Sequence, residues 1–125
     1  MHRAETTIFV VDDDVSMRRS LAVLLDNIGY RTRTYASAET FLANIEASDA
    51  HHGCIVLDIH LEGMSGVELA SRLAQTGNDL PIIFMTGKDS ETERRAALEP
   101  NCMAYLTKPF PAALLLDAID RALTN

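Results

Sequence analysis

Five short apolar runs alternate with segments of helical periodicity along this chain, and that alternation restricts the fold more than any other feature of the sequence. The runs lie at residues 8–11, 30–35, 54–58, 81–85 and 102–107. Between them, apolar residues recur with a helical period, most clearly at Met17, Leu21, Leu24, Leu25 and Ile28. Strands that alternate with helices predict right-handed crossovers and a parallel sheet covered on both faces. We therefore expect an α/β fold, a doubly wound (βα)5 chain whose five strands have the order 2-1-3-4-5.

Capping residues mark the ends of the predicted helices. Asp14 can cap the first helix, and Gly29 stands where a left-handed residue commonly ends one. The run 30–35 is more polar than the others, so we expect it at an edge of the sheet. The later helix starts are indicated by Ser37, by capping boxes at 65–68 and 90–93, and by Pro111 at the first position of the last helix.

Length and charge limit the class of protein. The 125 residues fit one domain, 1–125, which is either complete or cut from a longer parent protein. The net charge of −7 argues against direct binding of nucleic acid, which needs a basic face. Because no apolar stretch approaches the ~20 residues that cross a bilayer and no signal peptide is evident, we expect a cytoplasmic location without membrane contact. Cys54 and Cys102 form no CxxC pair and are expected to be small buried hydrophobes.

Four of the five predicted strands end in, or are directly followed by, a polar side chain that could act in catalysis or binding. Asp12 and Asp13 follow the first strand, Asp58 closes the third, Thr86 closes the fourth and Lys108 follows the fifth. Taken singly, each has an ordinary explanation as a helix cap, a turn former or a solvated surface residue. In the expected topology, however, these strand ends meet at one edge of the sheet, where open α/β proteins build their sites.

The chemistry of this set is that of phosphoryl transfer. Neighbouring carboxylates repel one another and need a cation or raised pKa values to be tolerated. Oxygen ligands without His or Cys favour Mg²⁺ over Zn²⁺, and Mg²⁺ sites commonly include substrate phosphate. A carboxylate nucleophile, a divalent cation, an ammonium and a hydroxyl are the groups that phosphoryl transfer requires.

These residues lie in five motifs, which are Val10–Asp14, Ile55–Asp58, Gly63–Gly66, Phe84–Gly87 and Lys108–Phe110. Together the motifs resemble those of the receiver domains of two-component response regulators. The resemblance covers essentially the whole chain and implies the flavodoxin-like fold of that family. It also implies a phosphoacceptor signalling domain rather than an enzyme, with a sensor histidine kinase or a phosphotransfer protein as partner.

The resemblance implies a role for each residue of the site. Asp58 would be the phosphoacceptor, and it would hold Mg²⁺ together with Asp12, Asp13 and the backbone carbonyl of His60. Lys108 would pair with Asp58 at rest and with the phosphoryl oxygens afterwards.

Two further positions resemble the family's conformational switch. Thr86 would move to hydrogen-bond the phosphoryl group, and Tyr105 would turn inward as Thr86 leaves its place. The face formed by the helix at 90–98, the strand at 102–107 and the last helix would change, and a homodimer could form through it. The resemblance also implies a cis peptide between Lys108 and Pro109.

Some positions depart from the family pattern. Leu61–Glu62 stands in place of Met-Pro, and Pro100–Asn101–Cys102 stands in place of Ala-Gly-Ala, where Asn101 could still adopt a left-handed turn. We expect these changes to affect partner preference and switching rather than phosphorylation. His60 and Lys88 line the approach for water; they are either merely exposed or they tune hydrolysis of the phosphoryl group.

Other interpretations are considered beside this one. A flavodoxin-type cofactor binder would need a Ser/Thr/Gly phosphate loop where residues 12–14 are acidic, and an aspartyl-nucleophile phosphatase would need an acid where His60 stands. A receiver-like module that works without phosphorylation would have no reason to keep the whole site. The stretch 35–42 is similar to a receiver subgroup that is often followed by a helix-turn-helix output domain.

Overall fold

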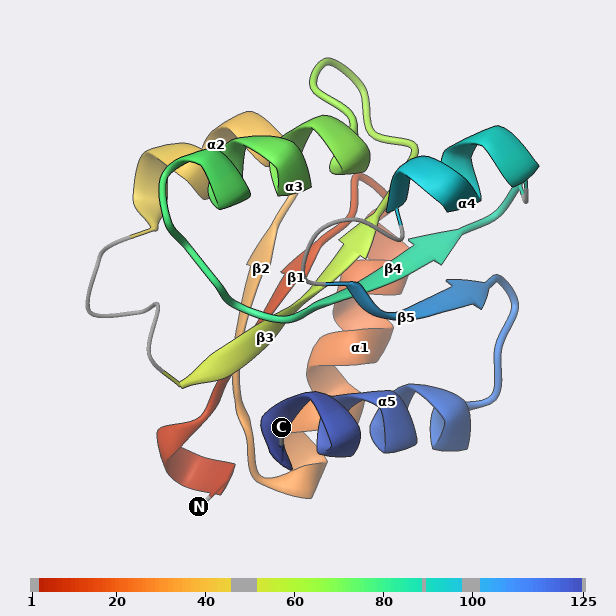
Figure 1. The fold of residues 1–125 in the computed structure, drawn as a ribbon. Helices are drawn as coiled ribbons and strands as arrows, with labels where there is room; N and C mark the ends of the chain where they lie inside the picture. Colours follow the sequence, from red (N-terminus) through yellow and green to blue (C-terminus); the bar gives the residue numbers. More distant parts are fainter. Residues whose placement is uncertain (1–2, 46–51, 89, 98–101, 125) are drawn as a thin grey trace.

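The computed structural model describes residues 3–45, 52–88, 90–97 and 102–124, and it confirms the predicted α/β fold. Five parallel strands form one sheet in the order β2-β1-β3-β4-β5 (Figure 1). The more polar strand β2 lies at an edge, as predicted. The strands are β1 (Thr7–Val11), β2 (Arg31–Tyr35), β3 (Gly53–Asp58), β4 (Ile82–Thr86) and β5 (Cys102–Thr107).

Helices cover both faces of the sheet. One face packs against α1 (Val15–Ile28) and α5 (Ala112–Thr124), as Figure 1 shows. The other face packs against α2 (Ala38–Asn44), α3 (Gly66–Gln75) and α4 (Glu91–Ala97). A short 3-10 helix, η1 (Arg3–Glu5), precedes β1. Within the described parts of the chain, no helix has the length and apolar character needed to span a membrane.

Alternating side chains of the central strands divide the core into two layers. In β1, Phe9 and Val11 face α2, α3 and α4, whereas Ile8 and Val10 face α1 and α5. β3 and β4 repeat this alternation, so their apolar side chains are buried on both faces of the sheet. This explains why these strands are continuous apolar runs rather than alternating ones. It also means that polar groups can be placed only where each run ends.

The predicted helix boundaries are confirmed to within a residue. Asp14 Oδ1 accepts hydrogen bonds from the amides of Ser16 at 2.9 Å and Met17 at 3.5 Å, and Gly29 ends α1 with a φ of 109°. Pro111 directly precedes α5 instead of being its first residue. A difference of this size is common where helix ends are irregular.

The two predicted capping boxes are only half formed. Ser65 Oγ accepts the amide of Glu68 at 3.1 Å, and Ser90 Oγ accepts the amide of Glu93 at 3.3 Å. In a complete box the glutamate carboxylates would reach back to the serine amides. Here both carboxylates instead contact basic side chains.

Both cysteines are free thiols, and the predicted burial is confirmed for Cys54 but only in part for Cys102. Cys54 is buried in β3, and burial raises the pKa of its thiol to about 12. Cys102 is partly buried at the start of β5. The turn predicted at Asn101 lies outside the described residues.

Candidate functional site

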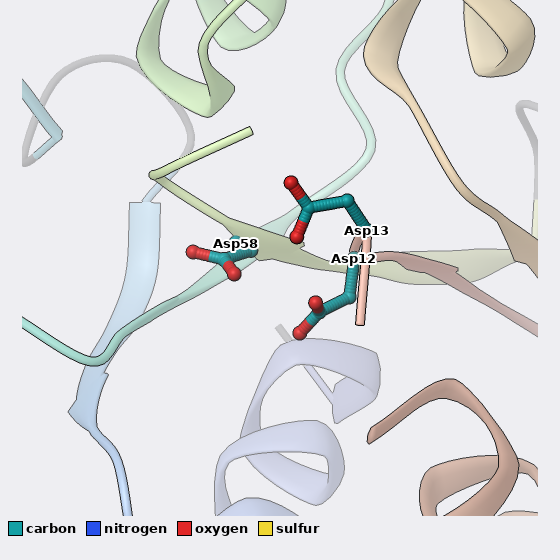
Figure 2. Close-up of side chains that lie close together, drawn as sticks. All are labelled: Asp12, Asp13 and Asp58. Atoms are coloured by element: carbon teal, nitrogen blue, oxygen red, sulfur yellow. The ribbon is translucent and has the colours of Figure 1, made fainter. Parts of the chain in front are cut away.

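Carboxylates at the ends of two neighbouring strands form the centre of the site. Asp12 directly follows β1 and Asp58 ends β3, and the strands pair with Val11 opposite Leu57. Asp12 is fully buried and Asp58 is 6% exposed, whereas Asp13 is exposed at the rim. Each of the three aspartates offers a carboxylate oxygen, and these oxygens lie within 4.8 Å of one another (Figure 2). The structure thus brings together the three carboxylates that the sequence predicts to meet.

Lys108 bridges the two buried carboxylates. Its Nζ lies 2.8 Å from Asp12 Oδ2 and 3.0 Å from Asp58 Oδ2. Its backbone amide donates to the carbonyl of Thr86 at 2.7 Å, and the Lys108–Pro109 peptide is cis, as predicted. Burial by itself would lower the pKa of Lys108, but the hydrogen bonds and charges of the two carboxylates raise it overall. The ammonium therefore stays charged and offsets part of the negative charge.

Burial is the strongest influence on the protonation of Asp58. It raises the pKa of the carboxyl above the ordinary value. The amide of His60, which donates to Oδ1 at 2.9 Å, and the Lys108 ammonium act in the opposite direction, while Asp12 adds repulsion. Because burial disfavours the ionised form of Asp58, a further cation close to this carboxylate would stabilise it.

The donor set fits a hard divalent cation. Three carboxylates beside one ammonium leave an excess of two negative charges in a cluster whose side-chain donors are all oxygens. Mg²⁺ prefers such ligands, and it typically takes one or two carboxylates while keeping waters or phosphate oxygens. The residues present therefore match the requirements of this ion.

The start of α3 is packed against the end of β3. The amide of Gly66, the first residue of α3, donates to the carbonyl of Ile59 at 2.9 Å. A Cβ at this position would collide with the carbonyl oxygen of Asp58. Glycine therefore lets the helix begin directly beside the acidic cluster.

Thr86 and Tyr105 contact residues outside the acidic cluster. The Thr86 hydroxyl donates to the carbonyl of Lys88 at 2.9 Å and accepts the Lys88 amide at 3.1 Å. Tyr105 is partly buried against the core below α4, and the guanidinium carbon of Arg94 lies 5.0 Å from its ring centre. Both residues are thus connected to the segment between β4 and the end of α4.

Three contacts around the site were not predicted from the sequence. Arg18 on α1 donates to the carbonyl of Asp12 at 2.8 Å, Glu93 on α4 lies 3.2 Å from Nε2 of His60, and Glu39 on α2 accepts a backbone amide of the loop after β3 at 3.0 Å. Arg18 could have been found, because it lies one helical turn beyond the α1 cap and so returns to the strand end. The two glutamates depend on how α2 and α4 approach that loop, which no local pattern specifies.

Comparison with known proteins identifies the family. Residues 8–120 match the family model of the response regulator receiver domain. The chain is 40% identical over 119 residues to the transcriptional regulatory protein TdiR of Thauera aromatica. The aligned residues cover 94% of this chain and 51% of TdiR. It is 34% identical over 116 residues to the transcriptional regulatory protein FixJ of Rhizobium meliloti, which covers 93% of this chain and 56% of FixJ. The chain therefore spans about half the length of the curated relatives it matches.

Solved structures agree with this assignment. The crystal structure of FixJ-N is 33% identical with a TM-score of 0.86 and covers 96% of this chain and 94% of that one. The BeF3-activated DrrB receiver domain is 28% identical with a TM-score of 0.83 and covers 96% of this chain and 98% of that one. In this family, a cluster such as Asp12, Asp13 and Asp58 is typical of the magnesium-binding site. The chain belongs to the response regulator receiver domain family, the signalling domains of two-component systems.

Proposed function

We propose that this domain works in the cytoplasm and that Asp58 accepts a phosphoryl group from a phosphohistidine of a sensor histidine kinase or a phosphotransfer protein. The observation that most supports this proposal is the Lys108 ammonium, which lies within hydrogen-bonding distance of Asp58 and Asp12 at once. Of these two carboxylates, Asp12 is fully buried, whereas Asp58 keeps 6% exposure. Asp58 is therefore the one that a phosphorus atom can approach.

The proposed step is an in-line displacement at phosphorus. A carboxylate oxygen of Asp58 forms the new O–P bond while the P–N bond of the phosphohistidine breaks and its electron pair leaves with the imidazole. Lys108 offsets the negative charge on the phosphoryl oxygens. Thr86 exchanges its hydrogen bond to the Lys88 carbonyl for one to a phosphoryl oxygen, which is the movement expected of it as a switch residue.

We propose Mg²⁺ as the cofactor of this step. Asp12, Asp13 and Asp58 would hold the ion together with the backbone carbonyl of His60. When bound, the ion supplies positive charge to the phosphoryl oxygens as the negative charge of the transition state develops. The all-oxygen donors and the excess negative charge of the cluster support this choice.

Phosphorylation would then change the face formed by α4, β5 and α5. A dianionic group at Asp58 supplies an interaction that differs between two arrangements of this face, which a population shift requires. Tyr105 on β5 and its contact with Arg94 on α4 support a role for this face in the response. We propose that the same face forms a homodimer.

The domain is proposed to be the receiver part of a longer regulator. TdiR and FixJ are transcriptional regulatory proteins, and the chain spans about half of their length. The stretch 35–42 is similar to a receiver subgroup that is often followed by a helix-turn-helix output domain. We therefore propose that phosphorylation of this domain controls an output domain of that kind.

Intact-mass measurement after incubation with acetyl phosphate tests the proposal. The wild-type protein should gain one phosphoryl group that requires Mg²⁺ and is released by hydroxylamine, as an acyl phosphate is. Asp58→Asn should gain none. Asp79→Asn, the same change at an exposed aspartate outside the cluster, should be labelled like the wild type.

Two results would contradict the proposal. An adduct that persists in Asp58→Asn would assign another acceptor. No adduct on the wild type, under conditions that label a known receiver domain, would favour an interaction module that works without phosphorylation.

A further inference from the structure

Alternate backbone amides of the loop after β3 donate to carboxylates from three different elements. The loop, residues 59–65, is thereby attached to β3, to the segment after β1 and to α2. Two of the acceptors belong to the acidic cluster, and the third is Glu39, which lies outside it. The pairs, with the distance from nitrogen to oxygen, are His60 to Asp58 at 2.9 Å, Glu62 to Asp13 at 3.3 Å and Met64 to Glu39 at 3.0 Å.

The loop passes directly over the Glu39 carboxylate. Gly63 has a φ of 77°, and a Cβ there would collide with Glu39 Oε2 and lie 3.3 Å from Cδ. The hydrogen bond from the Met64 amide is the main cause that lowers the pKa of Glu39 below its ordinary value. Glu39 is thus an ionised acceptor for the far end of the loop, and the glycine leaves room for it.

The loop has little rigidity of its own. It contains Gly63 and no proline, so its backbone is intrinsically free to adopt other conformations. Its near end is fixed by the amide of His60 on Asp58. Its middle is held by the amide of Glu62 on the exposed carboxylate of Asp13, a contact that lasts only while the loop stays in place.

We infer that Glu39 is a positioning residue for the magnesium site: by holding the amide of Met64, it fixes the loop whose Glu62 amide orients Asp13. The same hydrogen bond, from the Met64 amide to Glu39, also fixes the segment that carries the His60 carbonyl. The inference rests on the proposed binding of Mg²⁺ by the acidic cluster. Partners that orient metal ligands commonly change affinity by about 10- to 100-fold when they are removed.

Two substitutions test separately whether the length of the Glu39 side chain or its charge is needed for Mg²⁺ binding. Glu39→Asp keeps the charge but withdraws the carboxylate by one methylene, and we expect it to weaken Mg²⁺ binding by about tenfold, the lower end for such partners. Glu39→Gln loses the charge but keeps an acceptor oxygen at the same reach, and it should bind Mg²⁺ nearly as the wild type does. Glu62→Gln is the control, because it removes a charge from the loop itself and keeps the amide that donates to Asp13.

The Mg²⁺ dissociation constant would be measured by isothermal titration calorimetry on the unphosphorylated protein. Amide hydrogen exchange at Glu62 and Met64 without metal gives a second measurement, and both amides should exchange faster in Glu39→Asp. Thermal unfolding checks that each variant is folded, as expected for an exposed position.

The outcomes distinguish the inference from the proposed function. Wild-type Mg²⁺ affinity in Glu39→Asp, whether or not Glu39→Gln binds Mg²⁺ weakly, would overturn the positioning role and leave the metal site intact. A wild-type protein that does not bind Mg²⁺ would contradict the proposed cofactor itself.

Discussion

Replacing Gly66 by alanine tests whether the close approach of α3 to β3 maintains the site. The added Cβ would collide with the Asp58 carbonyl oxygen and lie 3.0 Å from both the Asp58 carbonyl carbon and the Ile59 Cα. All three are backbone atoms, so no side-chain rotation can relieve the contact. The first turn of α3 or the end of β3 must move, and the end of β3 carries Asp58.

The expected loss of stability follows from two opposing effects. Overpacking in a closely packed region costs about 1–3 kcal/mol. A glycine-to-alanine change in a helix returns roughly 0.5–1 kcal/mol because the unfolded chain loses freedom. We therefore expect Gly66→Ala to lower the free energy of unfolding by about 1–2 kcal/mol. With an unfolding entropy of about 2.1 cal/mol/K per residue, this lowers the Tm of a 125-residue chain by about 4–8 °C.

Urea and thermal denaturation measure this loss, and Gly87 provides the matched control. A Cβ on Gly87 would meet nothing within 4 Å, so Gly87→Ala should be as stable as the wild type or slightly more stable. Gly66→Ala should also be phosphorylated more slowly by acetyl phosphate, because Asp58 is displaced. Equal stability of the two variants would refute the argument that backbone contact at Gly66 fixes the end of β3.

Three further predictions concern the charged cluster and the thiols. Lys108→Met should bind Mg²⁺ about tenfold more tightly, a difference of about 1.4 kcal/mol, because the carboxylates lose their ammonium; calorimetry that shows weaker binding would contradict this. Burial raises the pKa of Asp58, so the folded state binds a proton on this carboxyl more tightly than the unfolded state does. The contribution of Asp58 to stability therefore falls as the pH rises through the folded-state pKa. Asp58→Asn should therefore be at least as stable as the wild type at neutral pH, and urea unfolding should show this advantage shrinking toward pH ~4. Burial raises the pKa of both thiols, but only Cys102 is partly accessible. A thiol reagent at mildly alkaline pH should therefore modify Cys102 slowly in the folded protein and reach the fully buried Cys54 only after unfolding. Equal reaction of the two thiols in the folded protein would contradict the packing of β3.

The fold could be predicted because its determinants are local. The apolar runs of β1, β3 and β4 require burial on both faces, and the caps at Asp14 and Ser65 define where α1 and α3 begin. The centre of the site follows from the same signals, since parallel strands place their carboxyl ends at one edge. Asp12 and Asp58 are therefore brought together by the pairing of β1 with β3.

The contacts that complete the site could not be predicted in this way. The bonds from Met64 to Glu39 and from Glu62 to Asp13 join residues 25 and 49 positions apart. They depend on the path of an irregular loop and on the distance of α2 from it, neither of which has a sequence period. The orientation of the Thr86 hydroxyl toward Lys88 is likewise a property of the loop after β4.

The attachment of α4 is consistent with the proposed response of this helix to a phosphoryl group on Asp58. Ala97 is its only buried residue, whereas α5 buries four side chains, so little apolar surface opposes a displacement of α4. In the described part of the chain, the polar contacts of α4 include Glu93 with His60, and Arg94 over the ring of Tyr105. Each of these partly exposed polar contacts contributes on the order of 1 kcal/mol or less. Because the amide of His60 also donates to Asp58, a new dianion at Asp58 would act directly beside the contact between His60 and Glu93, and in this way it could change the position of α4.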